Sequence, residues 1–186
     1  MENQPNPELQ KLGQQFSNGD AAAFDQIFDL FADKLFRYIS LKIKTDDAED
    51  ILELTLLKAW ENRDKYDSTK SNIQTWLFTI ARNTIIDHYR SYKEIISEEE
   101  GEINNIASED SPVKKAEQKL TQIAIEKALS ELSEIQREVI TLRYMEDLSF
   151  KEIAQILNKN EGTIRVIQLR ALSKLKSIMK KQSNSE

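Results

Sequence analysis

The side chains with the clearest binding chemistry lie near the C-terminus of this 186-residue chain. Residues 150–181 contain 8 basic and 2 acidic side chains, so this segment is a candidate surface for nucleic-acid phosphates. It also holds residue types that can recognise bases. Arginine binds guanine edges bidentately, glutamine binds adenine, and valine and leucine contact thymine methyl groups. The candidate DNA-binding residues are Thr163, Arg165, Val166, Gln168, Leu169 and Arg170, with Lys174 as a phosphate contact.

These candidates need a helix to present them, and the flanking sequence predicts a helix-turn-helix. Ser149 and Glu152 form a capping box at the start of a short first helix, and a similar box at Ser133 predicts one more helix before it. Asn158 stands at a turn where the backbone commonly needs a positive φ, and Asn160 caps a longer basic helix. The inward side of that helix is expected to comprise Ile164, Ile167, Ala171, Leu172, Leu175 and Ile178. The alternative is a solvated basic helix in an ordinary bundle, because lysines in a last turn also complement the helix dipole.

Three more helices are predicted in the N-terminal half, where capping side chains precede apolar residues at three- and four-residue spacing. The first follows Asp20 and the second follows Asp46. Ser71 and Gln74 form a capping box before the third, which is expected to end near Tyr92. The apolar face predicted for the first helix comprises Phe24, Ile27, Phe28, Phe31, Leu35, Ile39 and Ile43.

The composition favours an all-α fold. The chain has 4 Gly and 3 Pro, too few for the tight turns of a sandwich or barrel, and it has no Cys, which excludes disulfides, zinc–thiolate sites and thiol catalysis. No segment has the roughly 20 uninterrupted apolar residues of a membrane span, and the polar start is unlike a signal peptide. We therefore expect a cytoplasmic protein without a membrane insertion.

An acidic segment divides the chain. Residues 93–112 carry 7 acidic side chains, no aromatic residue and no sustained periodicity, which is typical of a solvated linker. We therefore expect two small helical domains, residues 1–92 and 113–186, joined by this acidic flexible linker. The alternative is a packed connector inside a single domain, because the isoleucines of the segment offer apolar surface that a core can bury.

Charge and residue content narrow the function classes. The net charge of −6 makes the whole chain a poor nonspecific DNA binder, although its C-terminal segment is basic. The sequence holds no nucleophile–base set, no phosphate-binding glycine loop and no cluster of metal ligands around its lone histidine, His88. We therefore expect no catalytic residues, no metal and no cofactor, and an enzyme is the least favoured class.

Three segments together resemble the extracytoplasmic-function (ECF, group 4) sigma factors of bacterial RNA polymerase. DAEDILELTLLKAW (residues 47–60) and SNIQTWLFTIARNTIIDHYR (71–90) are similar to the second conserved region of that group, and REVITLRYMEDLSFKEIAQILNKNEGTIRVIQLRALSKL (137–175) is similar to the fourth. The resemblance implies an RNA polymerase specificity subunit. Its N-terminal domain would bind the clamp coiled coil of the core enzyme and capture the melted minus-10 element, and its C-terminal domain would read the minus-35 element.

The resemblance also assigns residues by position. It implies that four acids on one helix bind the core polymerase: Asp47, Glu49, Asp50 and Glu53. It places the contacts to the single-stranded minus-10 element on Lys65, Arg82, Asn83, Asp87, His88 and Arg90. Guanidinium and amide groups can read unpaired bases, and Tyr89 is a candidate stacking platform. Trp76 shares a side with Ile73 and Ile80, so we expect it to pack in the core rather than to stack on a base.

Some positions depart from the family pattern. Glu53 and Leu56 stand where glutamine and phenylalanine are usual, and Val166 and Ile167 stand where serine and arginine are common. Arg165, before this last pair, and Arg170, after it, match the family pattern. Whether the helix reads a usual minus-35 sequence is therefore left open.

The resemblance implies two partners, core RNA polymerase and promoter DNA, and family members often have an anti-sigma factor as well. We expect the free chain to be a monomer. Two alternatives from other classes remain. One is a dimeric helix-turn-helix regulator that binds palindromic half-sites, and the other is a sigma mimic that binds an anti-sigma factor without initiating transcription.

Overall fold

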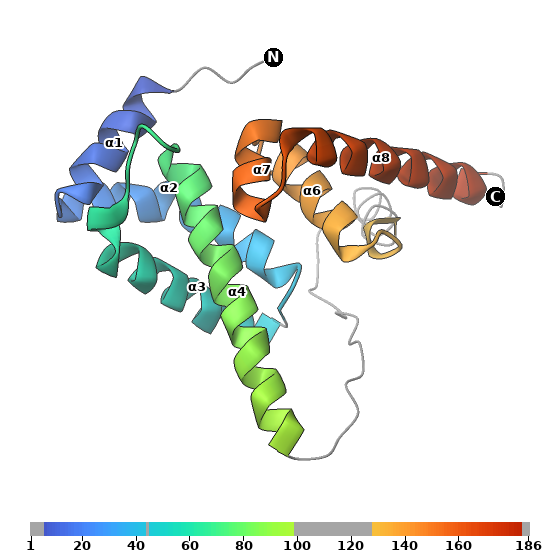
Figure 1. The fold of residues 1–186 in the computed structure, drawn as a ribbon, viewed down its shortest axis with the longest axis horizontal. Coiled ribbons are helices and arrows are strands. Elements are labelled where there is room, and N and C mark those ends of the chain that lie inside the picture. The colour runs from blue at the N-terminus through green and yellow to red at the C-terminus, as the bar shows by residue number, and fades with distance from the viewer. Residues whose placement is uncertain (1–5, 44, 99–127, 184–186) are drawn as a thin grey trace, which may run out of the picture. The chain divides into compact units, whose positions relative to one another are not determined.

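The computed structural model describes residues 6–43, 45–98 and 128–183. Every regular element among these residues is a helix, which confirms the fold class predicted from composition (Figure 1). The chain divides into two compact units, one formed mainly by the N-terminal half and one mainly by the C-terminal half. None of the helices in the described ranges combines the length and apolarity that a membrane crossing requires.

The N-terminal unit begins with a helix that the sequence analysis missed, α1 (Pro7–Ser17). The side chain of Asn6 caps it by accepting a hydrogen bond from the amide of Glu8 at 3.0 Å. Pro7 occupies the first helical position, where its missing amide hydrogen leaves no hydrogen bond unmade. This Asn-Pro pair is the local signal that would have identified α1.

The helix predicted after Asp20 is α2 (Ala21–Ser40), and the Asp20 carboxylate accepts hydrogen bonds from two amides of its first turn. The helix ends at Ser40, before the expected Ile43, which is buried beyond the helix end. The predicted apolar face is buried at Ile27, Phe31, Leu35 and Ile39 but not at Phe28, which is 47% exposed. The prediction for Phe28 is wrong because this residue lies at the edge of the apolar stripe, where part of its ring faces solvent.

Two further α-helices and one short 3-10 helix follow in the N-terminal unit. α3 (Thr45–Glu61) begins just before the predicted cap at Asp46, and the short 3-10 helix η1 (Arg63–Lys65) follows it. α4 (Ile73–Glu98) is capped by Asn72 rather than by the predicted Ser71, because the Asn72 side chain accepts a hydrogen bond from the amide of Thr75 at 2.7 Å.

α4 is longer than the sequence analysis expected. It continues to Glu98, past the predicted end near Tyr92, so the first residues of the segment 93–112 are helical. This stretch contains neither glycine nor proline, and no residue in it breaks a helix. The other residues of the predicted linker lie outside the described residues.

Aromatic rings from the helices of the N-terminal unit meet around Phe16 of α1. Its ring centroid lies 6.1 Å from that of Phe24 on α2 and 6.0 Å from those of Trp60 on α3 and Trp76 on α4. Trp76 also makes an edge contact with Tyr66, at 5.5 Å between centroids. Trp76 thus packs against core rings, as expected, although it is half-buried rather than fully enclosed. These contacts fix α3 and α4, which carry all the candidate residues of this unit except Lys65 on η1.

The C-terminal unit contains α6 (Glu134–Tyr144), α7 (Phe150–Leu157) and α8 (Glu161–Ser183). Both predicted capping boxes are present, at Ser133 and at Ser149. The small core between α6 and α8 comprises Leu132, Ile140 and Ala171, with Leu129 and Leu175 packed against it. Leu172 was expected on the inward side of α8, but it is 38% exposed because it lies at the margin of this narrow stripe.

Candidate nucleic-acid and polymerase interfaces

The turn between α7 and α8 has the geometry that the sequence predicts for a helix-turn-helix. Asn158 has φ of 50°, a left-handed conformation that asparagine tolerates better than most other residues. The Asn160 side chain accepts hydrogen bonds from the amide of Thr163 at 2.7 Å and from its hydroxyl at 2.8 Å. Asn160 therefore caps α8, and the turn fixes where the second helix begins.

The first turns of α8 present most of the predicted DNA-binding residues to solvent. Arg165, Val166, Leu169 and Arg170 are exposed, with Leu169 at 68% the most exposed of the apolar residues on this helix. On the opposite side, Ile164 and Ala171 are buried, as predicted from the 3.6-residue period. Thr163 and Gln168 are half-buried at the margin. The structure thus brings the predicted base-reading residues to one helix.

Three of the predicted residues on α8 make contacts that the sequence analysis did not identify. Arg165 forms an ion pair with Glu161, one turn earlier on the same helix. Gln168 donates a hydrogen bond to the hydroxyl of a tyrosine on α6, and Lys174 donates one to the backbone carbonyl of Glu131. Two of these partners lie outside the helix-turn-helix, so the local pattern carried no signal for them.

The acids assigned to core binding form an exposed surface on α3. All four residues, Asp47, Glu49, Asp50 and Glu53, are exposed. Two leucines that the sequence analysis did not select lie on the same solvent-facing side, Leu54 at 40% and Leu57 at 52% exposed. The opposite side of α3 is buried at Ile51, Thr55 and Ala59. The exposed side of α3 therefore combines negative charge with apolar contact area.

The residues assigned to the minus-10 element divide between two sides of α4. Asn83, Asp87 and Arg90 recur at four- and three-residue spacing, are all exposed, and share one side of the helix. Arg82 is half-buried next to them. His88 lies on another side, where its ring stacks on that of Tyr92 with 6.5 Å between centroids and 15° between planes. His88 is therefore separated from the other α4 candidates.

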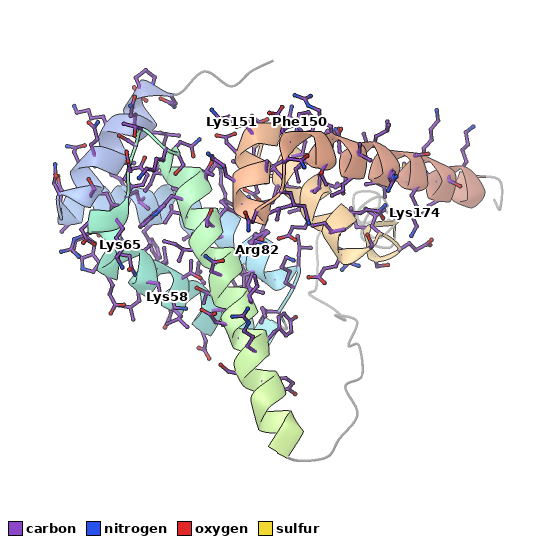
Figure 2. The ribbon with its side chains drawn as sticks, viewed as in Figure 1. Lys58, Lys65, Arg82, Phe150, Lys151 and Lys174 are labelled. Atoms are coloured by element: carbon purple, nitrogen blue, oxygen red, sulfur yellow. The ribbon has the colours of Figure 1, made fainter. Side chains whose placement is uncertain are left out.

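The carboxylate of Asp87 has a partner that the sequence analysis did not anticipate. Lys58 on α3 donates a hydrogen bond to it, with 3.1 Å between Nζ and Oδ2. Figure 2 shows Lys58, Lys65 and Arg82 with their side chains on this unit. Lys58 and Asp87 are distant in sequence and meet only because α3 packs against α4. The ion pair offsets the negative charge of Asp87 on the side of α4 assigned to DNA.

The loop before α4 is held by its own hydrogen bonds. Lys65, at the end of η1, is exposed and donates a hydrogen bond to the side chain of Asn62 at 2.6 Å. The Asp67 carboxylate accepts hydrogen bonds from the hydroxyl and amide of Thr69 and pairs with Lys70, and these interactions lower the pKa of Asp67 to about 2. The loop is therefore organised before any ligand binds.

No group of three or more potential metal ligands comes together within residues 6–43, 45–98 and 128–183. The side chains that the structure gathers are instead donors, acceptors and apolar groups on helix surfaces. Their chemistry suits a macromolecular ligand that lies across a helix rather than a small molecule enclosed by the protein.

Both halves of the chain match sigma factor families. Residues 28–95 match the model of Sigma-70 region 2, and residues 128–177 match that of Sigma-70, region 4. The first match contains α3, the loop after it and most of α4, and the second contains α6, α7 and most of α8.

Individual relatives agree with these matches. The chain is 31% identical to the ECF RNA polymerase sigma factor BldN of Streptomyces coelicolor, over 92% of this chain and 66% of BldN. It is 33% identical to the ECF RNA polymerase sigma factor SigL of Mycobacterium tuberculosis, over 78% of this chain and 82% of SigL. It resembles the sigma factor RpoE of Bartonella quintana, solved in complex with the anti-sigma factor NepR, with a TM-score of 0.68 and 31% identity over 84% of this chain and 96% of that chain. This chain therefore belongs to the ECF RNA polymerase sigma factors.

Proposed function

We propose that this chain directs core RNA polymerase to promoters through three helices. In this proposal α3 binds the core, α4 and the loop before it capture unpaired minus-10 bases, and α8 reads the minus-35 duplex. The observation that carries it is that one chain presents an acidic, partly apolar surface on α3 in one unit and an exposed set of base-reading side chains on α8 in the other.

Core binding is assigned to the exposed side of α3. Its acids are suited to a basic coiled coil on the polymerase, because complementary charge steers association and fixes the register of the two surfaces. Leu54 and Leu57 add apolar area that loses water on binding. We assign both leucines to the same contact as Asp50 and Glu53.

Minus-10 capture is assigned to the side of α4 shared by Asn83 and Arg90, together with Lys65. The amide of Asn83 can pair with the edge of an unstacked base, while the two cations bind phosphate. We assign Asp87 a different role from the base contact expected from the resemblance. Its ion pair with Lys58 offsets the negative charge of the carboxylate, so that this side of α4 repels the phosphates of the strand less.

Minus-35 reading is assigned to the exposed residues of α8. Arg165 and Arg170 are exposed, and a guanidinium can bind a guanine edge bidentately, while Val166 and Leu169 offer apolar contact to a thymine methyl. The valine stands where the family commonly has serine, so we propose that this helix prefers an upstream element with a thymine at the position that Val166 contacts.

The chain should bind promoters tightly only when core is present. Its net charge of −6 disfavours duplex binding by the free protein, and the core supplies position and additional phosphate contacts. Fluorescence anisotropy with a labelled promoter, with and without core, tests this expectation, and tight sequence-specific binding without core would contradict it.

Size-exclusion chromatography distinguishes the expected monomer from a dimeric regulator. Run-off transcription with core distinguishes an initiating sigma factor from a sigma mimic.

An anti-sigma factor is a further partner that we propose from the relatives. The structure of RpoE from Bartonella quintana contains the anti-sigma factor NepR. An anti-sigma factor of this chain should bind it and lower its run-off transcription with core. Adding more of this chain should relieve that inhibition.

A further inference from the structure

One phenylalanine ring in the C-terminal unit has two guanidinium groups next to it. Phe150, the first residue of α7, has its ring centroid 4.3 Å from Cζ of Arg165 on α8 and 5.1 Å from Cζ of Arg143 on α6. Figure 2 shows Phe150 on this unit. Arginine is the cation that stacks most favourably on an aromatic face, because its guanidinium is planar and weakly hydrated.

The position of this ring is fixed from the α6 side. Arg143 donates a hydrogen bond from Nη1 to the backbone carbonyl of Leu148 at 2.7 Å, and Leu148 is buried, with its own amide bonded to the carbonyl of Leu142. Asp147 has a positive φ of 53°, which reverses the chain between α6 and α7. The guanidinium of Arg143 therefore lies between a fixed carbonyl and the ring of Phe150, and it holds the ring in place.

The guanidinium of Arg165 is restrained at two points. One point is the ring of Phe150, and the other is the carboxylate of Glu161, which binds Nη2. The Arg165 side chain is still 58% exposed, so it faces solvent beyond these two contacts. A guanidinium has five N–H donors in one plane, and the ion pair uses only one edge of it. The ring thus restricts the orientations that the remaining donors can take.

Bidentate recognition of guanine depends on that plane. The O6 and N7 acceptors of guanine lie in the base-pair plane, so an arginine whose guanidinium is already oriented loses less side-chain entropy on binding. An unsupported arginine has more rotamer entropy to lose on binding, as do other long charged side chains. Orientation by stacking therefore acts on the selectivity for one base pair rather than on general DNA affinity.

We propose that Phe150 is a positioning residue for minus-35 recognition, holding the guanidinium of Arg165 in the plane that reads a guanine edge in the major groove. The proposal rests on the proposed function, in which Arg165 contacts a base. Phe150 itself does not touch DNA in this mechanism. Arg143 supports the ring, and α6 thereby contributes to the sequence preference of α8.

The test uses the full chain with core polymerase and a set of promoters in which each base pair of the upstream element is replaced in turn. Promoter binding is measured for the parent, Arg165→Ala, Phe150→Leu, Phe150→Met, Phe150→Tyr and the double variant Phe150→Leu/Arg165→Ala. Lys151→Ala is the matched control, because Lys151 is the neighbouring residue on α7 and is exposed. Thermal melting by circular dichroism reports whether each variant folds.

The expected result is specific to one base pair. Phe150→Leu and Phe150→Met lower discrimination roughly 3- to 10-fold at the same base pair where Arg165→Ala lowers it, in line with the strength of one cation–π contact. Phe150→Tyr retains the parental discrimination because it keeps the ring. The double variant discriminates no less than Arg165→Ala alone, and Lys151→Ala changes all promoters equally or not at all.

Each other outcome has a defined meaning. If Arg165→Ala has no base-specific effect, the assignment of Arg165 to base reading fails, whatever Phe150 does. If Arg165→Ala loses discrimination but the folded Phe150→Leu and Phe150→Met variants retain it, or weaken all promoters equally, the positioning role is overturned. It is also overturned if both non-aromatic variants fail to fold, since the ring is then a structural requirement.

Discussion

The side-chain amide of Gln168 on α8 donates a hydrogen bond to the hydroxyl of Tyr144 on α6, with 2.7 Å between Nε2 and Oη. Gln168 is half-buried, and Tyr144 is 56% exposed. The amide is therefore oriented by a residue from a helix outside the helix-turn-helix. Its carbonyl oxygen and second N–H hydrogen then have a defined direction, which suits recognition of an adenine edge.

Replacing Tyr144 by phenylalanine should relax selectivity at the base pair that Gln168 contacts. The change removes the acceptor but keeps the ring, and a single hydrogen bond of this kind contributes about 0.5 to 1.5 kcal/mol. Discrimination at that base pair should fall about 2- to 10-fold in competition binding with core present. Tyr92→Phe, which removes an exposed tyrosine hydroxyl from α4, serves as the control and should leave upstream selectivity unchanged. Equal losses at every upstream position would contradict the expectation.

Charge reversal on α3 should weaken core binding without unfolding the chain. Asp50→Lys combined with Glu53→Lys places two cations where we assign contact with a basic surface, and like charges across an interface cost several kcal/mol in comparable cases. Affinity for core, measured by fluorescence titration, should fall at least about 10-fold. Asp25→Lys with Asp29→Lys is the matched control, because both residues are exposed on α2. Unchanged core affinity of the α3 variant, with normal circular dichroism, would exclude this assignment.

Gly13 should tolerate no side chain. A Cβ atom at this position would lie 2.7 Å from Cε1 and from Oη of Tyr66, closer than non-bonded atoms approach. Gly13→Ala should therefore destabilise the N-terminal unit by about 1 to 3 kcal/mol in urea unfolding. Both tryptophans of the chain, Trp60 and Trp76, lie in this unit, so their fluorescence reports its unfolding.

Gly162 provides the contrast, because the nearest atom to a Cβ there is Oδ1 of Asn160 at 3.5 Å. Gly162→Ala should stabilise α8 by about 0.5 to 1 kcal/mol, since alanine has a smaller entropic cost in a helix than glycine. Circular dichroism follows this unit. If Gly13→Ala proved as stable as the parent, the predicted clash between a Cβ atom at position 13 and Tyr66 would be contradicted.

Tyr66 should make the N-terminal unit sensitive to alkali. Burial of its hydroxyl, with a smaller contribution from the nearby Asp67 carboxylate, raises its pKa from 10.0 to about 12. The folded state then keeps the proton to higher pH than the unfolded state. The contribution of Tyr66 to stability is therefore complete below pH 10 and decreases as pH rises towards 12.

Tyr66→Phe isolates this effect. The buried Oη has no hydrogen-bond partner among the described residues, so the variant should be at least as stable as the parent at neutral pH. Its advantage in free energy of unfolding should grow between pH 10 and pH 12, as measured by urea titration followed by tryptophan fluorescence. Parallel pH dependence of the two proteins would show that Tyr66 does not titrate as expected.

Local chemistry made parts of the fold predictable. The turn at Asn158 and the cap at Asn160 are confirmed, since each depends on one side chain and the backbone next to it. The cap of α4 was placed at Ser71 because serine suits this position as well as asparagine does, and only the backbone geometry selects Asn72. The exposure of Phe28 was not predictable either, because it depends on how much of α2 its neighbours cover.

The candidate interfaces were predictable to a similar extent. Residue type and helical period placed Arg165 and Leu169 on the exposed side of α8, where the structure has them. The ring next to the guanidinium of Arg165 belongs to Phe150 on α7, and the pairing of Lys58 with Asp87 joins two helices of the other unit. Such pairs depend on how helices pack, and a pattern read along one helix holds no information about them.

The ring of Phe16 has a practical consequence for dividing this protein. The match to Sigma-70 region 2 starts at residue 28, which leaves Phe16 and Phe24 outside it. A fragment cut at that boundary would keep both indoles but lose the phenyl groups that pack against them at tilted and edge angles, so its interior would open to water and its emission spectrum would shift to longer wavelength. The boundary of the family match at residue 28 therefore lies too late in the chain for a fragment that is to fold alone. A fragment for expression should begin no later than Asn6, which caps α1.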